Sequence, residues 1–252
     1  MSNNGLKQQV ALVTGASRGL GAAIVMALAR KGAQVGINYV SNQSRAIAVK
    51  EAILAEGGMA EIFQADVTDE QQVIRLCEEV RQKLGEVDIL VLNATSHHYH
   101  YKIEELRWEH MLEMMHFFVK SPLLLTQQVI GDMKQKKRGR IIHIGSEVFD
   151  QGIPEFSNYV AAKGAQLGLC RSWARELAPF GITVNYIAPG WIPTDMHVDT
   201  PAEVKENYRR AVPMQHMGEP ADVASMVAFL ASEEAKFITG QKISVNGGNT
   251  LS

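Results

Sequence analysis

The segment 10–30 constrains the fold more than any other part of this chain. A continuous apolar run at 10–13 leads into a glycine-rich loop, which opens an apolar helical pattern ending near Arg30. Such a run suits a strand that is buried on both faces of a parallel sheet. Glycines at positions 15, 19 and 21 let the backbone turn tightly and approach a phosphate at the helix N-terminus. The segment therefore predicts a strand, a phosphate-binding loop and a helix.

Strand and helix patterns alternate along the rest of the chain. Further apolar runs lie at 33–39, 61–65, 87–92, 140–144 and 182–187, with helical patterns between them. This alternation predicts an α/β fold with a doubly wound parallel sheet and a ligand at the carboxyl ends of its strands. With 252 residues, 46% of them hydrophobic, the whole chain 1–252 is expected to form one domain.

Composition narrows the class of partner and the compartment. A net charge of −2 gives no reason to expect binding to nucleic acid or to a membrane surface. No apolar run approaches the ~20 residues of a membrane span, and the polar N-terminus lacks the apolar core of a signal segment. Cys77 and Cys170 lie in separate helical patterns. They are expected to be reduced thiols in a cytoplasmic protein.

The end of the second strand bears on the choice of cofactor. In many dinucleotide-binding folds an acid about twenty residues beyond the loop binds the ribose 2′-hydroxyl. Residues 22–50 contain no Asp or Glu, and the strand ends in Tyr39 followed by Ser41 and Asn42, with Arg18 in the glycine loop. Neutral donors with an arginine suit a 2′-phosphate, which favours NADP(H) over NAD(H). Ser41 and Asn42 also suit a helix cap.

The catalytic hypothesis depends on Ser146, Tyr159 and Lys163. Tyr159 and Lys163 are one helical turn apart and so share a helix face. An ammonium beside a phenol favours the phenolate and is expected to lower the Tyr159 pKa, which is about 10 in free tyrosine. Ser146 follows the strand 140–144, and its hydroxyl would orient a carbonyl oxygen while Tyr159 exchanges a proton. Such Tyr and Lys pairs also occur on plain solvated helices, so the spacing alone does not decide.

Taken together, these residues closely resemble the short-chain dehydrogenase/reductase family, over about residues 8–250. The glycine loop resembles the family's cofactor loop, and Ser146 with Tyr159-x-x-x-Lys163 resembles its catalytic set in spacing and order. The resemblance implies an NAD(P)-dependent oxidoreductase with a single Rossmann-type sheet of about seven strands. It also implies a homotetramer.

The resemblance also implies a set of cofactor contacts. They are Thr14, Gly15, Ser17, Arg18, Gly19, Leu20, Gly21, Tyr39, Ser41, Asn42, Asp66, Val67, Asn93, Ala94, Tyr159, Lys163, Pro189, Gly190, Ile192 and Thr194. Asp66 would bind the adenine, Lys163 the nicotinamide ribose, and the Ile192 backbone the carboxamide. The segment 191–217 would form a lid over the substrate.

Within the family, segments 187–196 and 238–241 most resemble the 3-oxoacyl-carrier-protein reductase branch. The expected activity is NADPH-dependent reduction of a 3-oxoacyl thioester or similar ketone to an alcohol, with Tyr159 as acid and base. Two alternatives remain open. One is a reductase or dehydrogenase of a small non-acyl ketone or alcohol, and the other is an NADP-binding module with weakened catalysis.

Two departures from the family pattern motivate the second alternative. Thr95 places a Cβ where the family usually has glycine beside the cofactor. In the long helix expected at 104–134, the family has an Asn that holds a water in a proton relay to the lysine. Phe118 or Met115 takes that place, depending on the alignment, and neither holds a water by hydrogen bonding. His116 is the nearby polar substitute.

Two polar clusters are weaker signals. The histidines at 97, 98 and 100 match no standard zinc spacing, so no metal site is predicted and the run is expected to be a loop at the pocket mouth. His143 lies inside a strand pattern and is expected in the core. The basic segment 134–140 would attract an acidic carrier protein, but a solvated helix end is the favoured interpretation.

Overall fold

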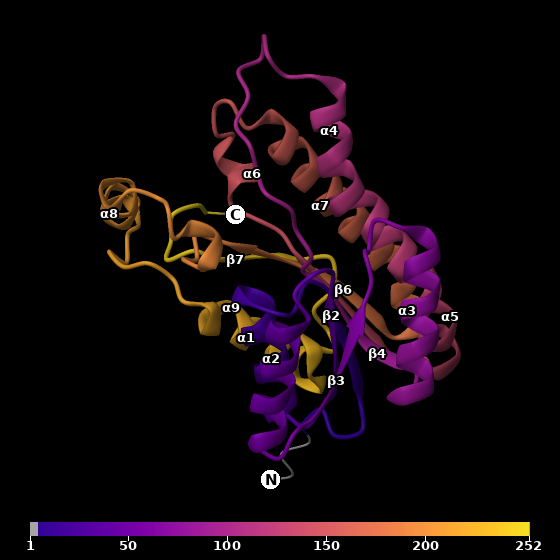
Figure 1. Ribbon diagram of the computed structural model, residues 1–252. Coiled ribbons are helices and arrows are strands. Elements are labelled where there is room, and N and C mark those ends of the chain that lie inside the picture. Colours follow the sequence, from indigo (N-terminus) through magenta and orange to yellow (C-terminus); the bar gives the residue numbers. More distant parts are fainter. Residues whose placement is uncertain (1–4, 252) are drawn as a thin grey trace.

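A single all-parallel sheet of seven strands organises the computed structural model, which describes residues 5–251 (Figure 1). The spatial order is β3-β2-β1-β4-β5-β6-β7. The strands are β1 Val10–Val13, β2 Gln34–Tyr39, β3 Met59–Gln64, β4 Val87–Leu92, β5 Gly139–Ile144, β6 Ile182–Pro189 and β7 Lys242–Val245. This is the Rossmann-type α/β fold that the sequence predicted. Most of the polar N-terminus, on which the absence of a signal segment was predicted, lies outside the described residues.

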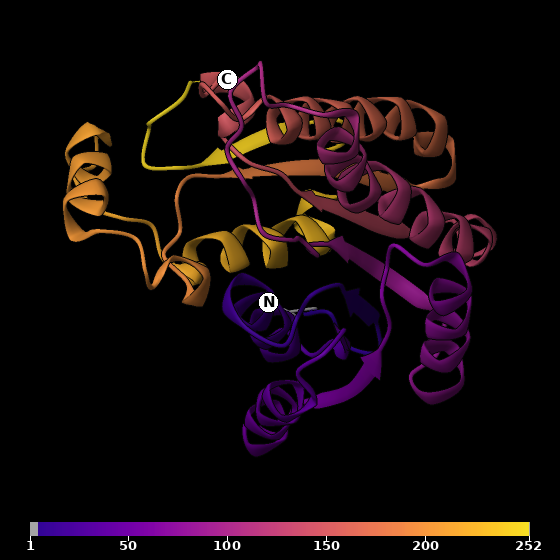
Figure 2. The same ribbon diagram turned by 45° about the horizontal axis from the view of Figure 1, so that its top comes forward.

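Helices cover both faces of the sheet (Figure 2). Helices α1, α2 and α9 pack on one face, and α3, α5 and α7 pack on the other. The helices are α1 Gly19–Arg30, α2 Gln43–Ala55, α3 Glu70–Lys83, α4 Trp108–Met115, α5 Ser121–Lys136, α6 Val148–Gln151, α7 Ser157–Leu177, α8 Ala202–Ala211 and α9 Pro220–Ala231. None of the described helices is long and apolar enough to cross a membrane.

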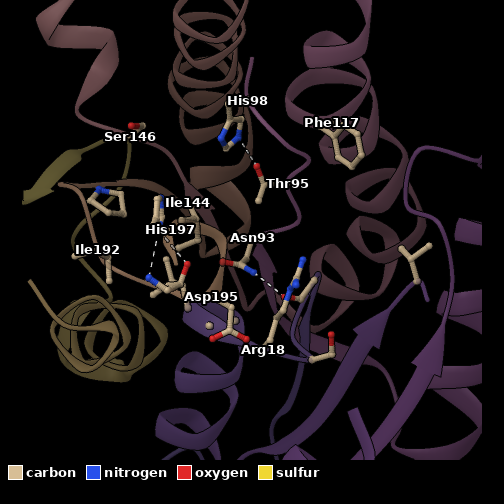
Figure 3. Close-up of a pocket in the computed structure, with 18 of the residues that line it drawn as sticks. Arg18, Asn93, Thr95, His98, Phe117, Ile144, Ser146, Ile192, Asp195 and His197 are labelled. Carbon is tan, nitrogen blue, oxygen red and sulfur yellow. Dashed lines mark hydrogen bonds between the residues drawn. The ribbon is translucent and has the colours of Figure 1, made fainter. Parts of the chain in front are cut away.

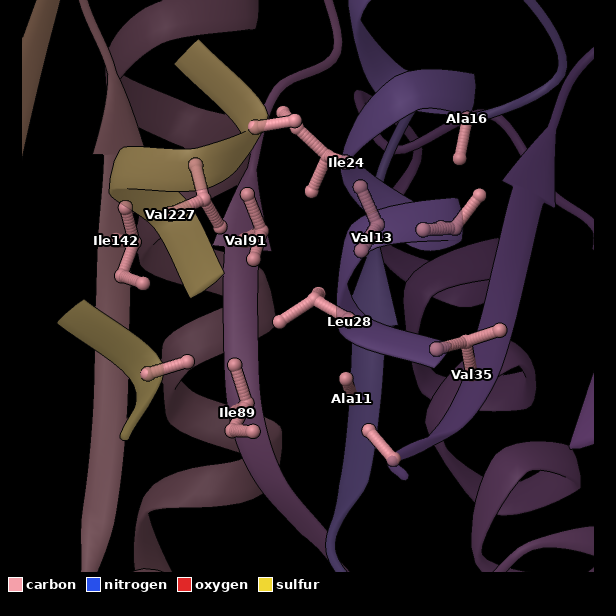
Figure 4. Close-up of a cluster of buried hydrophobic side chains, with 14 of the residues drawn as sticks. Ala11, Val13, Ala16, Ile24, Leu28, Val35, Ile89, Val91, Ile142 and Val227 are labelled. Carbon is pink, nitrogen blue, oxygen red and sulfur yellow. The ribbon is translucent and has the colours of Figure 1, made fainter. Parts of the chain in front are cut away.

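The double covering explains the uniformly apolar strands. Ala11 and Val13 of β1 face α1 and α9, where they pack with Ile24 and Leu28 (Figure 4). Leu12, between them, faces the opposite core under α3 and α5. Successive side chains of a strand point to opposite faces, so a strand with two buried faces has no polar positions. The order reverses between β1 and β4, which opens a crevice at the carboxyl ends of the strands.

The expected long helix at 104–134 is wrong in its bounds and its regularity. Helix α4 begins at Trp108, and α5 continues to Lys136. Between them the segment His116–Lys120 is π-helical. A π-helical turn inserts extra residues and changes which side chains face inward. Counting from either end of the segment toward the relay position therefore crosses an irregular turn.

Strands β1 to β6 begin and end within two residues of the predicted apolar runs. Helix α7 carries both Tyr159 and Lys163. The last strand, β7 at Lys242–Val245, was not among those runs. Gly247 and Gly248 have φ of 62° and 85°, which takes the chain out of the extended conformation directly after β7.

Candidate active site

A cavity of about 540 Å³ opens at the carboxyl ends of the strands (Figure 3). Every site residue predicted from the sequence lines it except Thr14, Val67 and Ala94. The glycine loop, the end of β2, the serine after β5 and helix α7 are therefore brought together around one space. The wall also includes Phe117, which the sequence did not indicate, and His98, Asp195 and His197, which lie in the loop expected at the pocket mouth and in the expected lid.

Thr14 and Asn93 shape the glycine loop from behind. The Thr14 hydroxyl accepts hydrogen bonds from the backbone N–H groups of Asn93 and Ala94, both at 2.9 Å. The Asn93 amide donates to the carbonyl oxygens of Thr14 at 2.8 Å and Gly15 at 3.2 Å. These bonds tie the end of β4 to the loop after β1. The two elements on either side of the crevice are thereby fixed relative to each other.

The glycine loop is built to approach a ligand closely. Gly15 and Gly19 have φ of 62° and 53°, a conformation that favours glycine. A Cβ on Gly21 would lie 2.4 Å from the Gly15 carbonyl oxygen and 2.7 Å from the Asn93 amide nitrogen, so no side chain fits there. Helix α1 starts with no side-chain cap and no acid in its first turn. Its N-terminus therefore suits the pyrophosphate of a dinucleotide.

Polar groups gather at the end of the cavity beside β2. Arg18, Tyr39, Ser41, Asn42 and Asp66 all line it. The Asn42 side chain also accepts the N–H of Arg45 at 3.0 Å, so it caps α2 as the alternative interpretation proposed. Capping of α2 and binding of a cofactor are compatible, because the cap uses only the amide oxygen of Asn42 and its N–H groups can still donate to a ligand.

Arg45 has a partner that the sequence did not indicate. Its guanidinium donates to Asp195 at 2.5 Å and so joins the start of α2 to the segment after β6. Both side chains are about half exposed. Asp195 lies on the cavity wall, and the arginine balances its charge.

Ser146, Tyr159 and Lys163 converge at the other end of the cavity. The Ser146 N–H donates to the buried Tyr186 hydroxyl at 3.2 Å, which fixes the backbone after β5. Lys163 Nζ donates to the Ile144 carbonyl oxygen at 2.9 Å and to Gln166 Oε1 at 3.2 Å. Lys163 is 2% exposed and Tyr159 is 8% exposed, so both polar groups work in a largely dry environment.

The expectation that Lys163 lowers the Tyr159 pKa is wrong for this structure. Burial raises the pKa of Tyr159, with the Ser146 side chain acting in the opposite direction. Burial also lowers the pKa of Lys163 well below its usual value. The physical reason is desolvation, which disfavours both the phenolate and the ammonium. Lys163 points toward Ile144 and Gln166, and its nitrogen lies 5.4 Å from the centre of the Tyr159 ring.

Phe118, and not Met115, faces Lys163. Lys163 Nζ lies 3.6 Å from the centre of the Phe118 ring, and Phe118 is buried. His116 is exposed and does not take the place of the missing polar group. The ammonium therefore meets an aromatic face where the family pattern has an amide.

The histidine loop contributes one ring to the site. His98 lies on the cavity wall, and its ring centre is 4.2 Å from that of Tyr159. Its Nε2 is 2.8 Å from the Thr95 hydroxyl, so two unusual residues of this chain form a pair. Burial lowers the pKa of His98 to about 3 and keeps the ring neutral. Among the described residues, no three His, Cys, Asp or Glu side chains are placed to hold a metal ion.

Glu147 connects the serine to the segment 191–217. Glu147 is buried, and its Oε1 accepts the Tyr208 hydroxyl of α8 at 2.6 Å and the Asn249 amide at 3.0 Å. The Tyr208 oxygen in turn accepts the Trp191 N–H at 2.8 Å. Sequence reasoning missed Glu147 and Tyr208. The available signal was an acid directly after the proposed catalytic serine in an otherwise apolar stretch.

The basic segment 134–140 is largely paired within the chain. Lys136 and Arg138 both reach Asp88, at 3.0 and 3.3 Å, and Arg140 reaches Glu233 at 3.1 Å. His143, in the same strand as Arg140, is fully buried as predicted. These ion pairs favour the structural interpretation of the segment.

Comparison with known proteins agrees with this geometry. The family model described as enoyl-(acyl carrier protein) reductase matches residues 15–250. The 3-oxoacyl-(acyl-carrier-protein) reductase FabG of Staphylococcus aureus is 41% identical over 94% of this chain and 96% of its own length. A blue fluorescent protein from a metagenomic library, crystallised with NADPH, is 36% identical with a TM-score of 0.89, over 98% of this chain and 100% of its own. A short-chain dehydrogenase/reductase from Serratia marcescens is 33% identical with a TM-score of 0.90, over 98% and 99% of the two chains.

The chain belongs to the short-chain dehydrogenase/reductase family. It is an NAD(P)-dependent oxidoreductase of the carbonyl reductase class. The match extends over nearly the full length of the chain and of these relatives, so it includes both the glycine loop and the Ser146–Lys163 region.

Proposed function

We propose that this protein uses NADPH to reduce a ketone, either a 3-oxoacyl thioester or a similar carbonyl compound, to an alcohol. One observation carries the proposal. Ser146, Tyr159 and Lys163 line the same cavity as the glycine loop and the end of β2. A carbonyl held by the two hydroxyl groups would thus share one space with a dinucleotide bound along the strand ends.

The residues of the cavity fit a nicotinamide dinucleotide. The glycine loop and the N-terminus of α1 would hold the pyrophosphate, because no side chain intrudes there. Asp66 would accept a hydrogen bond from the adenine, Lys163 would bind the nicotinamide ribose, and the Ile192 backbone the carboxamide. When bound, the cofactor supplies the hydride.

Arg18, Ser41 and Asn42 favour NADP(H) over NAD(H). They line the cavity beside the end of β2, where no acid occurs between residues 22 and 50. A guanidinium and neutral donors bind a phosphate, whereas a carboxylate would repel it.

Ser146 and Tyr159 would handle the carbonyl oxygen. The Ser146 hydroxyl orients it, and the Tyr159 hydroxyl donates the proton as negative charge develops there. The raised pKa of Tyr159 keeps the phenol protonated near neutral pH, which suits a proton donor in the reductive direction. The Lys163 ammonium then stabilises the negative charge left on Tyr159. The reverse oxidation would use the same groups.

The substrate is less defined than the reaction. The curated relative from S. aureus is named for a 3-oxoacyl-carrier-protein substrate. In this chain, most cations of the basic segment are engaged in ion pairs, which favours a free ketone or a small thioester over a docked carrier. A reductase of a small non-acyl ketone is therefore the second candidate function.

Three further features belong to the proposal. The chain acts as one domain, with 191–217 as a lid tied down by Tyr208 and Glu147. It acts as a cytoplasmic homotetramer. The Phe118 ring beside Lys163 supports the alternative of an enzyme with weakened catalysis that mainly binds NADP(H).

The test is NADPH consumption with acetoacetyl thioesters and free ketones, comparing wild type with Tyr159→Phe. We expect Tyr159→Phe to lower kcat by about 100-fold or more, the usual contribution of a positioned proton donor. NADPH binding should change little, since the phenyl ring remains. A wild type that is no faster than Tyr159→Phe on every carbonyl would refute the reductase and favour the binding module. Comparison of thioesters with ketones separates the two enzyme functions.

A further inference from the structure

Lys163 is a buried lysine without an acidic partner. It is 2% exposed, and no carboxylate among residues 5–251 forms an ion pair with it. Burial alone accounts for the direction of its pKa shift. A buried ammonium is costly unless hydrogen-bond acceptors or a π-system surround it. The groups that do surround it therefore control both its position and its charge.

Three neutral groups surround the ammonium. The Ile144 carbonyl oxygen accepts from Nζ at 2.9 Å, and Gln166 Oε1 accepts at 3.2 Å. The Phe118 ring lies over the nitrogen at 3.6 Å from its centre. Ile144 contributes through the backbone, and Phe118 offers only a ring face. Gln166 is the side-chain acceptor, and it is placed one helical turn after Lys163 on the same face of α7.

The burial of Gln166 makes this contact stand out. Gln166 is 1% exposed, although glutamine is usually a surface residue. A buried amide that lacked a partner would destabilise the fold. The Lys163 contact gives its carbonyl oxygen a charged donor, which is among the stronger kinds of hydrogen bond.

The titratable neighbours of Lys163 carry no compensating charge. Tyr159 lies on the same helix, His98 on the loop after β4 and His143 on β5. Burial lowers the pKa of both histidines to about 3, and it raises the pKa of Tyr159. All three are therefore neutral near pH 7, and none balances the ammonium.

We propose that Gln166 is a positioning residue for the reductase reaction, because its side-chain carbonyl, together with the Phe118 ring, holds the Lys163 ammonium in place and in its charged form. The inference rests on the proposed function, in which Lys163 stabilises the charge that develops on Tyr159. It supplies a polar partner for Lys163 in a chain that has Phe118 where the family pattern has an amide.

The contact predicts the direction in which substitutions of Gln166 change the Lys163 pKa. Removing the acceptor leaves the ammonium with one hydrogen bond and lowers the Lys163 pKa further. The neutral amine no longer favours the Tyr159 anion, so activity is lost at a lower pH. Adding a negative charge at the same place has the opposite effect. Gln166→Met and Gln166→Glu, both close to glutamine in size, should therefore shift Lys163 in opposite directions.

The experiment measures the Lys163 pKa directly by NMR of protein labelled at the lysine 13Cε, with the signal assigned from Lys163→Arg. We expect Gln166→Met to lower this pKa by about one unit, the size expected for one hydrogen bond to a charged group. Gln166→Glu should raise it. Gln127→Met makes the same chemical change at an exposed site on α5 and should leave the Lys163 signal unchanged.

The pH profile of kcat for ketone reduction provides the second readout. Its alkaline limb should move to lower pH in Gln166→Met and to higher pH in Gln166→Glu. A merely structural role would lower the melting temperature and leave both the limb and the Lys163 pKa in place. An unchanged alkaline limb and an unchanged Lys163 pKa in folded Gln166→Met would overturn the proposal. If Gln166→Met does not fold, an unchanged Lys163 pKa in Gln166→Glu would overturn it.

The two proposals fail in different ways. If wild type turns over no carbonyl but Gln166 variants shift the Lys163 pKa, the proposed function fails and Gln166 still holds the lysine. If wild type turns over and Lys163 does not respond to Gln166, only the role of Gln166 is refuted.

Discussion

The two ends of the cavity are built in different ways. At the end that we propose binds the cofactor (the cofactor end), backbone geometry defines the site. Gly15 and Gly19 adopt positive φ, Gly21 has no room for a Cβ, and the Thr14 and Asn93 bonds fix the loop. At the end that holds the proposed catalytic residues (the catalytic end), contacts between side chains define the site, as when Lys163 meets Phe118 and Gln166, and Glu147 meets Tyr208.

This difference explains which end could be interpreted from sequence. A backbone-defined site requires glycine at fixed positions, so its spacing is visible in the chain. A side-chain-defined site tolerates substitution when neighbouring residues compensate. Phe118 in place of an amide motivated the alternative of an NADP-binding module with weakened catalysis. Gln166, on another helix, supplies a polar contact to the same lysine.

The largest effect is expected from Gly21→Ala at the cofactor end. Its Cβ would clash with the Gly15 carbonyl oxygen, which is backbone, and with the Asn93 amide, which two hydrogen bonds hold in place. We expect NADPH affinity to fall by about 100-fold, from the strain of overpacking a fixed site. Isothermal titration calorimetry would measure it.

Gly131→Ala is the matched control, because a Cβ at Gly131 in α5 meets nothing within 4 Å. It should bind NADPH like wild type and gain a little stability from the better helix propensity of alanine. Unchanged NADPH binding in Gly21→Ala would show that backbone geometry does not fix the cofactor end. The proposed difference between the two ends of the cavity would then be wrong.

A smaller effect is expected at the catalytic end from Tyr208→Phe. The change removes the donor to Glu147 and the acceptor for the Trp191 N–H, but it keeps the ring. We expect the KM for the ketone to rise by about 10-fold, since the lid segment loses its polar attachment beside Ser146. Steady-state kinetics would measure KM and kcat, with NADPH affinity nearly unchanged.

Tyr99→Phe removes the same hydroxyl group from a side chain that is 56% exposed and serves as the control. It should leave the kinetic constants as they are. If Tyr208→Phe behaves like Tyr99→Phe, the segment 191–217 is held by packing, and side-chain hydrogen bonds do not define this end.

The smallest effect concerns the sheet that both ends share. His143 on β5 is fully buried, both ring nitrogens lack a partner among the described residues, and burial lowers its pKa to about 3. The folded-state pKa lies below the unfolded value of about 6.5, so its contribution to stability is present above pH 6.5 and is lost as pH falls toward 3.

We expect His143→Leu to remove this pH dependence. Between pH 7 and pH 5.5, wild type should lose about 1 kcal/mol more unfolding free energy than the variant, because its unfolded chain binds the extra proton. Urea unfolding at the two pH values measures the difference. His98 has a similarly lowered pKa and is present in both proteins, so it cancels. Equal losses of unfolding free energy in wild type and His143→Leu would show that His143 does not cause this pH dependence.

The sequence by itself determined the fold class and the glycine-loop end of the cavity. The apolar run at 10–13, the glycines at 15, 19 and 21 and the absence of acids at 22–50 report local backbone geometry and local charge. The prediction that Tyr159 and Lys163 lie on one helix is also confirmed, because α7 carries both residues. The residues that form each of these features are close together in the sequence, so their spacing can be recognised from the sequence alone.

Only the tertiary structure decided the environment of Tyr159 and Lys163. The π-helical segment His116–Lys120 placed Phe118 against Lys163, and burial raised the Tyr159 pKa that the sequence had predicted to fall. The Glu147 to Tyr208 bond likewise joins residues from separate parts of the chain. Desolvation and contacts between distant elements depend on how helices pack on the sheet, and the local sequence carries no signal for either.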